Sequence, residues 1–550
     1  MPFSRFVADT DPGATLRFSV VLRLPGAAAM GRYLEEVADP AAAQYHRYLD
    51  PEEFGRRFGL SRGRIAAAEA DLRGAGFDVL GANAERTAIQ LRGSVGAVSR
   101  LFDLRMGDFR ERSGRRFHSP LEEPTIPPSL SDAVVGVSGL NGAQRPTERS
   151  VPSTGLKPAD VEKAYDIGPL HDQGIDGHGM TIGIVSFASF RQQDVDAFDE
   201  AAGTSGPAPR IVKVNGGSDE TAGGNSGEVT LDIDTIRSVA PKAQIVSYEA
   251  QAPTPSLKEF ASSFTENMSA VIDRIVADGK VDVVSISWGM CDTPQLQPGT
   301  PWIAPADRLR TLRSFQAAQA AGISIFAAAG DAGAYDCQEY DLGLQQLATD
   351  WPSDYAPVIA VGGTNLSVRS DGTYLQEAGW EDILERTGGG GGVNPMDPKP
   401  SWQVGPGVDN QFSNGRRQVP DVAADADPST GFFSVAGNEK NGKSEGHVVG
   451  GTSAAAPFWA ASMLLIEQYA AKQGVRKLGF VSPVLYAIAA HQNPKFPSFH
   501  DVTLGGNRYY DATPGWDFAT GLGSPDVFNL ARAMVDYARA HPAAGGGGGK

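Results

Sequence analysis

Hydrophobic and polar residues alternate along the larger, C-terminal part of the chain in blocks that predict a succession of strands and helices. Short apolar runs predict strands at residues 181–186, 244–248, 281–288, 323–328 and 358–361, and the segments between them predict helices at 226–239, 256–278 and 306–320. The run 281–287 is mostly apolar, which is typical of a strand covered on both faces. This alternation predicts an α/β domain built on a largely parallel sheet.

The N-terminal part has a different order of elements. Its pattern predicts strands at 16–24, 77–81, 87–91 and 104–118, and helices at 27–38, 61–75 and 94–102. This order predicts an α+β domain of the ferredoxin-like, split β-α-β type. No group of residues in this part has the spacing of a catalytic site.

Composition marks the boundaries between the parts. Residues 120–157 are rich in Pro, Ser, Gly and Thr, as exposed linkers and nicking sites are. We expect an N-terminal domain at 1–145, a processing linker at 146–157, a second domain at 158–541 and a glycine-rich tail at 542–550. The glycine block at 388–392 predicts a flexible loop.

Length and charge narrow the classes of function. A chain of 550 residues is too long for one ordinary core, so two or more domains are expected. The net charge of −17 argues against a nucleic-acid partner, because phosphate binding needs a basic surface. Residues 1–150 contain 20 Arg, no Lys and 19 acidic residues, whereas the rest of the chain has 28 basic and 46 acidic residues. This asymmetry indicates two units with different roles.

No segment predicts a membrane span. The most apolar stretch, 454–471, contains Pro457 and Glu467, so it predicts a buried helix. Residues 1–5 lack the apolar core of a secretory signal, so export would require a leader already removed or another route.

Ser453 lies in the octet Gly-Gly-Thr-Ser-Ala-Ala-Ala-Pro at 450–457, between a strand-like segment and the long apolar run. Glycines at a strand-to-helix turn permit unusual backbone angles, and the new helix offers unpaired N–H groups and the positive end of its dipole. A nucleophile would be well placed there. A helix N-cap explains the same residues equally well.

Glu228 and Asp232 lie four residues apart in a predicted helix that Asn225 and Ser226 would cap. Both carboxylates therefore project from one helix face, one turn apart. Such a pair is either merely solvated or part of a site in which one carboxylate tunes the pKa of the other. A serine nucleophile needs a base, and a carboxylate can serve if a second carboxyl group orients it.

Together with the turn Gly330-Asp331-Ala332-Gly333, these segments resemble the sedolisins, the serine-carboxyl peptidases, and most closely the kumamolisin type. The family patterns G-T-S-x-x-x-P, E-x-x-x-D and G-D-[SA]-G occur here in the family's order, and the resemblance covers nearly the whole chain. Residues 45–54 resemble the propeptide of pro-kumamolisin-like proteins, although a generic helix entry would look similar. Gly450 and Ala332 stand where many members have Ser, and neither changes a proposed catalytic atom.

The resemblance implies a subtilisin-like catalytic domain and an acid-active serine-carboxyl endopeptidase made as a zymogen. It implies that Ser453 is the nucleophile of an acyl-enzyme mechanism, that Glu228 is general base and later acid, and that Asp232 orients Glu228. Asp331 would complete the oxyanion hole with the N–H of Ser453; a turn-forming role is its alternative. In the oxyanion hole Asp331 must be protonated, because only the neutral acid can donate a hydrogen bond. This requirement, and a carboxyl base with a pKa of about 4, favour acidic conditions.

The resemblance also implies protein or peptide substrates, the propeptide as an intramolecular inhibitor that covers the cleft, a monomer, and secretion into an acidic environment. At neutral pH the arginines of the propeptide would pair with carboxylates of the catalytic domain. Acidification would weaken these pairs and release residues 1 to about 150 through self-cleavage between about 120 and 157.

A histidine triad of the subtilisin type shares the serine signature but does not fit this chain. Its aspartate should follow the first core strand as D-[ST]-G, where this chain has Ser186-Phe187-Ala188. Its histidine should open a helix as H-G-T-H, where this chain has Gly227-Glu228. None of the eight histidines, including His178, has either context.

A second group of candidate residues lies near the C-terminus. By resemblance to the sedolisins, the side chains of Asp501 and Asp517 and the carbonyl groups of Val502, Thr513 and Gly515 would bind one calcium ion, a donor set that suits this hard cation. Thr513 stands where kumamolisin-like members have Gly. By composition alone, two loop aspartates are more often turn residues.

Residues that follow predicted strands give two further predictions. Trp288 and the segment Asp350-Trp351-Pro352 would line the substrate cleft, with Asp350 favouring a basic or polar side chain; a structural role for each tryptophan is an equal alternative. Cys291 and Cys337 lie past the same end of the sheet, and relatives with this spacing have a disulfide, so we predict one here.

Two other classes of function compete with the peptidase. Glu228 and Asp232 could be the carboxyl pair of a glycosidase, but such groups face a sugar from different sides, and these two project from one helix face. The chain could also be an inactive relative that binds or inhibits. The presence of all four proposed catalytic residues argues against this alternative.

Overall fold

The computed structural model describes residues 4–111, 116–140, 155–221, 224–251, 264–292, 303–339, 345–438, 441–475 and 477–542. All but the first residue of the predicted tail at 542–550, most of the predicted linker at 146–157 and the first residues of the helix predicted at 256–278 lie outside these ranges.

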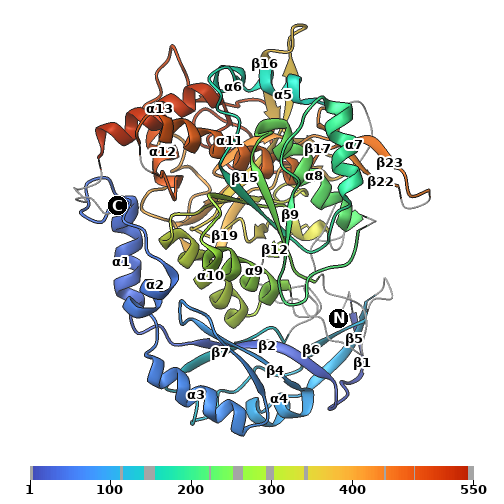
Figure 1. The fold of residues 1–550 in the computed structure, drawn as a ribbon, viewed down its shortest axis with the longest axis vertical. Helices are drawn as coiled ribbons and strands as arrows, with labels where there is room; N and C mark the ends of the chain where they lie inside the picture. Colours follow the sequence, from blue (N-terminus) through green and yellow to red (C-terminus); the bar gives the residue numbers. More distant parts are fainter. Residues whose placement is uncertain are drawn as a thin grey trace.

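The N-terminal domain contains the predicted ferredoxin-like sheet. Its four strands are β2 (Thr15–Leu22), β3 (Asp78–Ala82), β4 (Ala88–Ser94) and β7 (Val134–Ser138), in the order β3-β4-β2-β7, and all neighbours are antiparallel. Helices α3 (Arg62–Gly74) and α4 (Val95–Phe102) lie along this sheet (Figure 1). Their apolar residues and those of β2 form one core, so the predicted α+β class is confirmed.

The fourth strand of this sheet is not the predicted one. Residues 104–118 form two shorter strands, β5 (Met106–Glu111) and β6 (Arg116–Pro120), which pair with β1 (Ser4–Asp9) in a separate sheet. The edge position next to β2 is taken by β7, whose Val134 and Val137 are buried. Residues 120–140 therefore belong to the N-terminal domain and not to a linker.

The C-terminal domain has the predicted, largely parallel sheet. Its strands follow the order β16-β15-β13-β11-β8-β10-β9, β21 also pairs with β15, and only the β15–β16 pair is antiparallel. Their bounds are β8 Thr181–Ser186, β9 Arg210–Lys213, β10 Gln244–Glu249, β11 Val283–Ile286, β13 Ser324–Ala328, β15 Ile359–Val368, β16 Tyr374–Gly379 and β21 Val422–Asp425.

Helices cover both faces of this sheet. α9 (Phe264–Asp278) and α10 (Pro305–Ala320) pack together and lie between the sheet and the N-terminal domain (Figure 1). α8 (Gly224–Val239) packs against α11 (Thr452–Lys472), which in turn contacts β11, β13 and β15. α8 begins before Asn225 and Ser226, so these residues lie inside the helix and the predicted cap is wrong.

The remaining described elements are short or peripheral. The helices are α5 (Pro158–Ala164), α6 (Gly168–His171), α7 (Gln192–Ala202), α12 (Ser482–Ala490) and α13 (Val527–Ala540). Four antiparallel strand pairs have the bounds β17 Glu381–Asp382 with β18 Thr387–Gly388, β19 Gly392–Pro398 with β20 Arg416–Val419, β22 Phe432–Gly437 with β23 Ser444–Val449, and β24 Phe499–His500 with β25 Ser524–Pro525.

The glycine block at 388–392 is not the predicted flexible loop. Its glycines are buried, and a Cβ atom at Gly390 would clash with the carbonyl group of Ala329. The N–H of Gly390 donates to the carbonyl oxygen of Gly330 at 2.8 Å. The glycines are therefore needed for close backbone approach, and they hold this segment against the turn that leads to Asp331.

The N-terminal domain docks on α10 and its surroundings. Leu24, Phe54 and Phe58 share an apolar cluster with Ala317 and Ala320 of α10, together with residues of α1 (Ala27–Ala38) and α2 (Pro51–Arg57). Polar contacts join the same surfaces: Ser19 donates to Glu266 Oε1 at 2.5 Å, and the N–H of Gly139 donates to Asp307 Oδ1 at 3.0 Å. The two domains thus form one packed unit.

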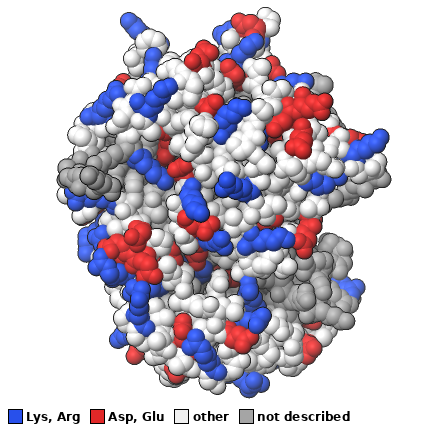
Figure 2. Space-filling view, in the orientation of Figure 1, with Lys and Arg blue, Asp and Glu red and all other residues white. Residues whose placement is uncertain are grey.

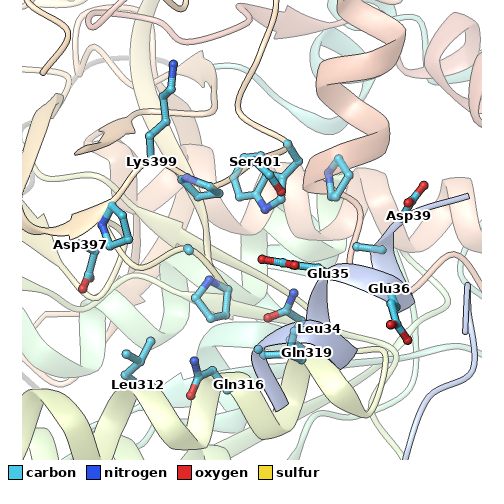
Figure 3. Close-up of a pocket in the computed structure, with 18 of the residues that line it drawn as sticks. Leu34, Glu35, Glu36, Asp39, Leu312, Gln316, Gln319, Asp397, Lys399 and Ser401 are labelled. Atoms are coloured by element: carbon cyan, nitrogen blue, oxygen red, sulfur yellow. The ribbon is translucent and has the colours of Figure 1, made fainter. Parts of the chain in front are cut away.

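A cavity of about 780 Å³ lies at the seam between the domains (Figure 3). It is bounded by Glu35 and Glu36 of α1 on one side and by Lys399, Ser401 and neighbouring prolines of the C-terminal domain on the other. None of the four proposed catalytic residues lines it.

None of the helices in the described part of the chain combines the length and apolar character needed to cross a membrane.

Candidate active site

Ser453 is the second residue of α11, where the chain turns from β23 into the helix. The N-cap is Gly451, with φ of +87°, and it offers no side-chain cap, so Ser453 does not have the capping role considered above. Ser453 is 7% exposed, and its Oγ lies 3.3 Å from the carbonyl oxygen of Ser287. The side chain is therefore free of a helix-capping duty and faces the end of β11.

Asp232 is connected to Ser453 through Ser287. The Ser287 hydroxyl lies 2.5 Å from Asp232 Oδ1 and 3.0 Å from the carbonyl oxygen of Ser453. The Ser287 hydroxyl has one proton and donates it to Asp232 or to Ser453; it bonds both at once when a protonated Asp232 donates to the Ser287 oxygen instead. Complete burial raises the pKa of Asp232 well above its usual value, and the bond from Ser287 offsets only part of that rise.

Glu228 lies one helical turn before Asp232 on α8 and is buried at 4% exposure. Because α8 packs on α11, the structure brings the helix of both carboxyl groups against the helix of Ser453. Burial excludes the solvated-pair interpretation of these two carboxylates.

Asp331 lies opposite the start of α11, in the turn after β13. Its Oδ1 accepts hydrogen bonds from the N–H of Thr452 at 2.7 Å and from the Thr452 hydroxyl at 2.8 Å. A Cβ atom at Gly451 would lie 2.6 Å from Asp331 Oδ2, so the glycine is required for this approach. Asp331 thus satisfies a free N–H group of the helix and places its second oxygen beside the residue before Thr452-Ser453.

Sequence reasoning missed Ser287 and Thr452 as members of the site. Ser287 follows directly after β11, at the carboxyl end of a parallel strand, where functional side chains often gather, and this position was the available signal. Thr452 lies within the serine octet, but nothing in the sequence indicates that its hydroxyl bonds Asp331.

Comparison with known proteins agrees with this geometry. Residues 3–142 match the family model described as "Pro-kumamolisin, activation domain", and residues 154–483 match that of the "Subtilase family". Kumamolisin from Bacillus sp. (strain MN-32) is 31% identical, over 94% of this chain and 92% of that protein. Sedolisin from Pseudomonas sp. (strain 101) is 27% identical, over 94% of this chain and 87% of that protein. The chain belongs to the sedolisin family.

A solved structure supports the same assignment. Pseudomonas sedolisin, a serine-carboxyl proteinase complexed with two molecules of pseudo-iodotyrostatin, superposes with a TM-score of 0.56 at 26% identity, covering 71% of this chain and 99% of that one. The predicted subtilisin-like fold with an N-terminal activation domain is therefore confirmed, and the chain is a serine-type endopeptidase with its own propeptide. The residues around Ser453 differ from a histidine triad, because β8 ends in Ser186 and α8 carries Glu228.

The disulfide predicted for this sedolisin is present. Cys291 and Cys337 are bonded, with Cα atoms 4.9 Å apart. Cys291 belongs to β12 (Met290–Asp292), which pairs with β14 (Thr349–Trp351), and Cys337 belongs to the 3₁₀ helix η1 (Asp336–Glu339). The bond ties η1 to the strand pair that follows β11.

Trp288, Asp350 and Trp351 are buried, with at most 3% exposure. The Trp288 ring packs against Phe187, and the Trp351 ring packs against Phe264. These contacts support the structural role for both tryptophans over a cleft-lining one. Asp350 is likewise enclosed by its neighbours among the described residues.

The structure brings most of the proposed calcium ligands into one loop region. Asp501 accepts the N–H of Gly515 at 3.1 Å, and Asp517 Oδ2 accepts the N–H of Thr513 at 2.9 Å. Burial raises the pKa of Asp517 to about 6, against the effect of its hydrogen bonds, so a nearby cation would stabilise its charged form. The described residues contain no group of three or more His, Cys, Asp or Glu side chains suited to a metal. A cation here would therefore depend on backbone carbonyl groups.

Proposed function

We propose that this endopeptidase hydrolyses peptide bonds with a Ser453–Glu228–Asp232 triad, assisted by Asp331, and that it works at acidic pH. The observation that supports this most directly is the position of Ser453. On one side it is linked through Ser287 to a buried Asp232, and on the other it follows the residue whose N–H and hydroxyl bond Asp331.

In the proposed reaction, Ser453 Oγ attacks the substrate carbonyl carbon while Glu228 accepts the hydroxyl proton. Glu228 then donates this proton to the leaving amine as the C–N bond breaks, which leaves an acyl-serine. A water molecule, deprotonated by Glu228, attacks the acyl group, and the proton returns to Ser453 as the enzyme is regenerated. Asp232, protonated by burial, positions Glu228 and limits the charge on the pair.

Asp331 and the N–H of Ser453 would stabilise the negative oxygen of the tetrahedral intermediate. Asp331 Oδ1 is already occupied by two donors from Thr452, so the proton for the oxyanion would be on Oδ2, the oxygen beside Gly451. This donation requires the neutral acid, which favours acidic conditions.

A calcium site at Asp501, Val502, Thr513, Gly515 and Asp517 is the second part of the proposal. Asp501 and Asp517 would supply charge, and the other three residues would supply carbonyl oxygens. Its role would be structural, because these residues close a loop remote in the chain from Ser453. In the same proposal the enzyme is a secreted monomer, with residues 1–145 as propeptide and 146–157 as processing linker.

The test is hydrolysis of a denatured protein substrate at about pH 4 by wild type and by Ser453→Ala. We expect the substitution to reduce kcat by at least about 10⁴-fold, because the members of a triad act as a unit. Cleavage of the protein substrate by Ser453→Ala at the wild-type rate would overturn the proposal. A wild type that cleaves an oligosaccharide but no protein would favour the glycosidase.

A further inference from the structure

Asp336 and Asp350 form a buried carboxyl pair beneath the turn that carries Asp331. Asp336 begins η1 and Asp350 lies in β14, and their carboxyl groups are close enough to hydrogen-bond when a proton lies between them. Both are almost fully enclosed, with exposures of 0% and 3%. A hydrogen bond between two carboxyl groups requires that they share a proton.

This pair touches the backbone on both sides of the site. A Cβ atom at Gly330, the residue before Asp331, would clash with Asp336 Oδ1 and would lie 3.1 Å from Cβ of Asp350. A Cβ atom at Gly289, two residues after Ser287, would clash with the Asp350 carboxyl group. The two carboxyl groups therefore fill the space between the Asp331 turn and the segment that carries Ser287.

The charged groups with the largest effect on Asp350 are acidic. Burial is the largest cause that raises the pKa of Asp350 well above its usual value, and the neighbouring acids Asp336, Glu339 and Asp354 raise it further. Glu339 also accepts the N–H of Asp331 at 3.2 Å, while the cations Arg308 and Arg417 act on Asp354. Loss of the shared proton would therefore place neighbouring negative charges in a site almost closed to solvent.

The disulfide limits how this repulsion could be relieved. Cys337 is adjacent to Asp336, and Cys291 lies directly opposite Asp350 in the β12–β14 pair. The covalent bond keeps η1 and β14 together. The backbone at Gly330 and Gly289 would then move instead, because glycine has no side chain that restricts its backbone angles.

We propose that Asp336 and Asp350 are positioning residues of this peptidase: their shared proton holds the Asp331 turn and the Ser287 segment at the spacing that catalysis requires. Loss of that proton toward neutral pH then disables the site independently of the triad. This inference rests on the proposed role of Asp331.

The test compares the pH profiles of kcat for wild type, Asp350→Asn and Asp350→Leu. The amide of Asp350→Asn can donate to Asp336 without a shared proton. For this variant we therefore expect a kcat close to that of wild type at about pH 4 and an unchanged KM. The pH at which kcat falls on the alkaline side of the profile should rise by about one unit. Asp350→Leu loses the hydrogen bond, and kcat should fall about 10-fold or more at every pH. Glu467→Gln is the matched control, because Glu467 is a buried acid of α11 with a pKa raised to about 8 by burial.

An Asp350→Asn profile that coincides with those of wild type and Glu467→Gln would overturn the inference. If Asp350→Asn does not fold, Asp336→Asn offers the same comparison from the other partner. The proton itself can be followed in the inactive Ser453→Ala protein by the infrared C=O stretch of protonated carboxyl groups. We expect a component that persists above the normal range of aspartate and disappears in either Asn variant; its absence would also overturn the inference. The infrared measurement does not depend on enzyme activity. An inactive wild type would therefore refute the proposed function, while the infrared spectrum would still show whether Asp336 and Asp350 share a proton.

Discussion

Among the described residues, the catalytic domain buries many more of its acidic side chains than the propeptide does. In the propeptide, carboxylates pair with arginines at the surface, as in Arg92–Asp78 at 3.0 Å and Arg105–Glu122 at 2.9 Å. Both signs of charge are interspersed over the visible face of this domain (Figure 2). In the catalytic domain, Asp232, Asp350 and Asp425 are buried, and burial raises each pKa well above its usual value.

This difference gives the two domains opposite responses to acid. The pKa of Glu122 is lowered by hydrogen bonds from Arg105, so the stability it contributes is present above its unfolded pKa and is lost as the pH falls. Burial raises the pKa of Glu249 to about 7 and that of Glu467 to about 8, so the folded state binds more protons than the unfolded state from about pH 4.5 up to those values. Acid should therefore weaken surface ion pairs such as Arg105–Glu122 and strengthen the parts of the catalytic domain that hold buried carboxyl groups.

Buried acidic residues at the interface between the two domains also have raised pKa values, as those inside the catalytic domain do. Glu85 of the propeptide has a pKa raised to about 8, and Glu266 of α9, which accepts a bond from Ser19, has a pKa raised to about 7, in both cases chiefly by burial. Protonation of these two groups favours docking. We expected acid to weaken docking by protonating carboxylates at the interface, and this does not hold for Glu85 and Glu266. Release of the propeptide at acidic pH would therefore begin with the loss of ion pairs inside the propeptide.

The largest expected effect is cleavage of the chain between the propeptide and the catalytic domain. Wild type held at about pH 4 should lose residues 1 to about 150, whereas Ser453→Ala should stay full length, because self-cleavage needs the nucleophile. Gel electrophoresis and intact mass measure the outcome. Equal shortening of a Ser453→Ala protein free of other proteases would refute self-processing.

The next largest expected effect is that the catalytic domain is more stable in weak acid than in weak base. The processed catalytic domain should melt several degrees higher at about pH 5 than at about pH 8, because raised pKa values make folding take up protons over this window. Calorimetry at matched ionic strength measures it. Glu467→Gln should reduce the difference. A higher melting temperature at the alkaline pH would contradict the proposed contrast between the domains.

Calcium removal should affect only the catalytic domain. A ligand that binds only the folded state at about 100 times its Kd stabilises by about 2.7 kcal/mol, so chelation at about pH 7 should lower the melting temperature by roughly 3 °C. Asp501→Asn combined with Asp517→Asn should abolish the difference between chelator and added calcium. Identical melting curves of wild type in both conditions would eliminate the site.

The smallest expected effect lies at the interface. Glu266→Gln keeps an acceptor for Ser19 but never ionises, so propeptide docking should be tighter than in wild type at about pH 7, and processing there should slow about three- to tenfold. At about pH 4 the two proteins should behave alike. Faster processing of Glu266→Gln at neutral pH would show that an ionised Glu266 strengthens docking.

The sequence by itself determined the elements and the residues whose signal is local. The bounds of α1 and β8 match their predictions, and Ser453, Glu228, Asp232 and Asp331 were singled out by short motifs that resemble those of the sedolisins, although their catalytic roles stay predictions. Such signals survive in the sequence because caps, turns and apolar periodicity depend on neighbours within a few residues of the chain.

Tertiary structure decided what depends on contacts between distant segments. Only the assembled sheet shows that β7, and not residues 104–118, pairs with β2, and only packing shows that Gly390 must lie against Ala329. The link from Asp232 to Ser453 through Ser287, and the meeting of Asp336 with Asp350, join residues far apart in the chain. No local pattern encodes these distances, because they are set by how whole elements fill the core and exclude water.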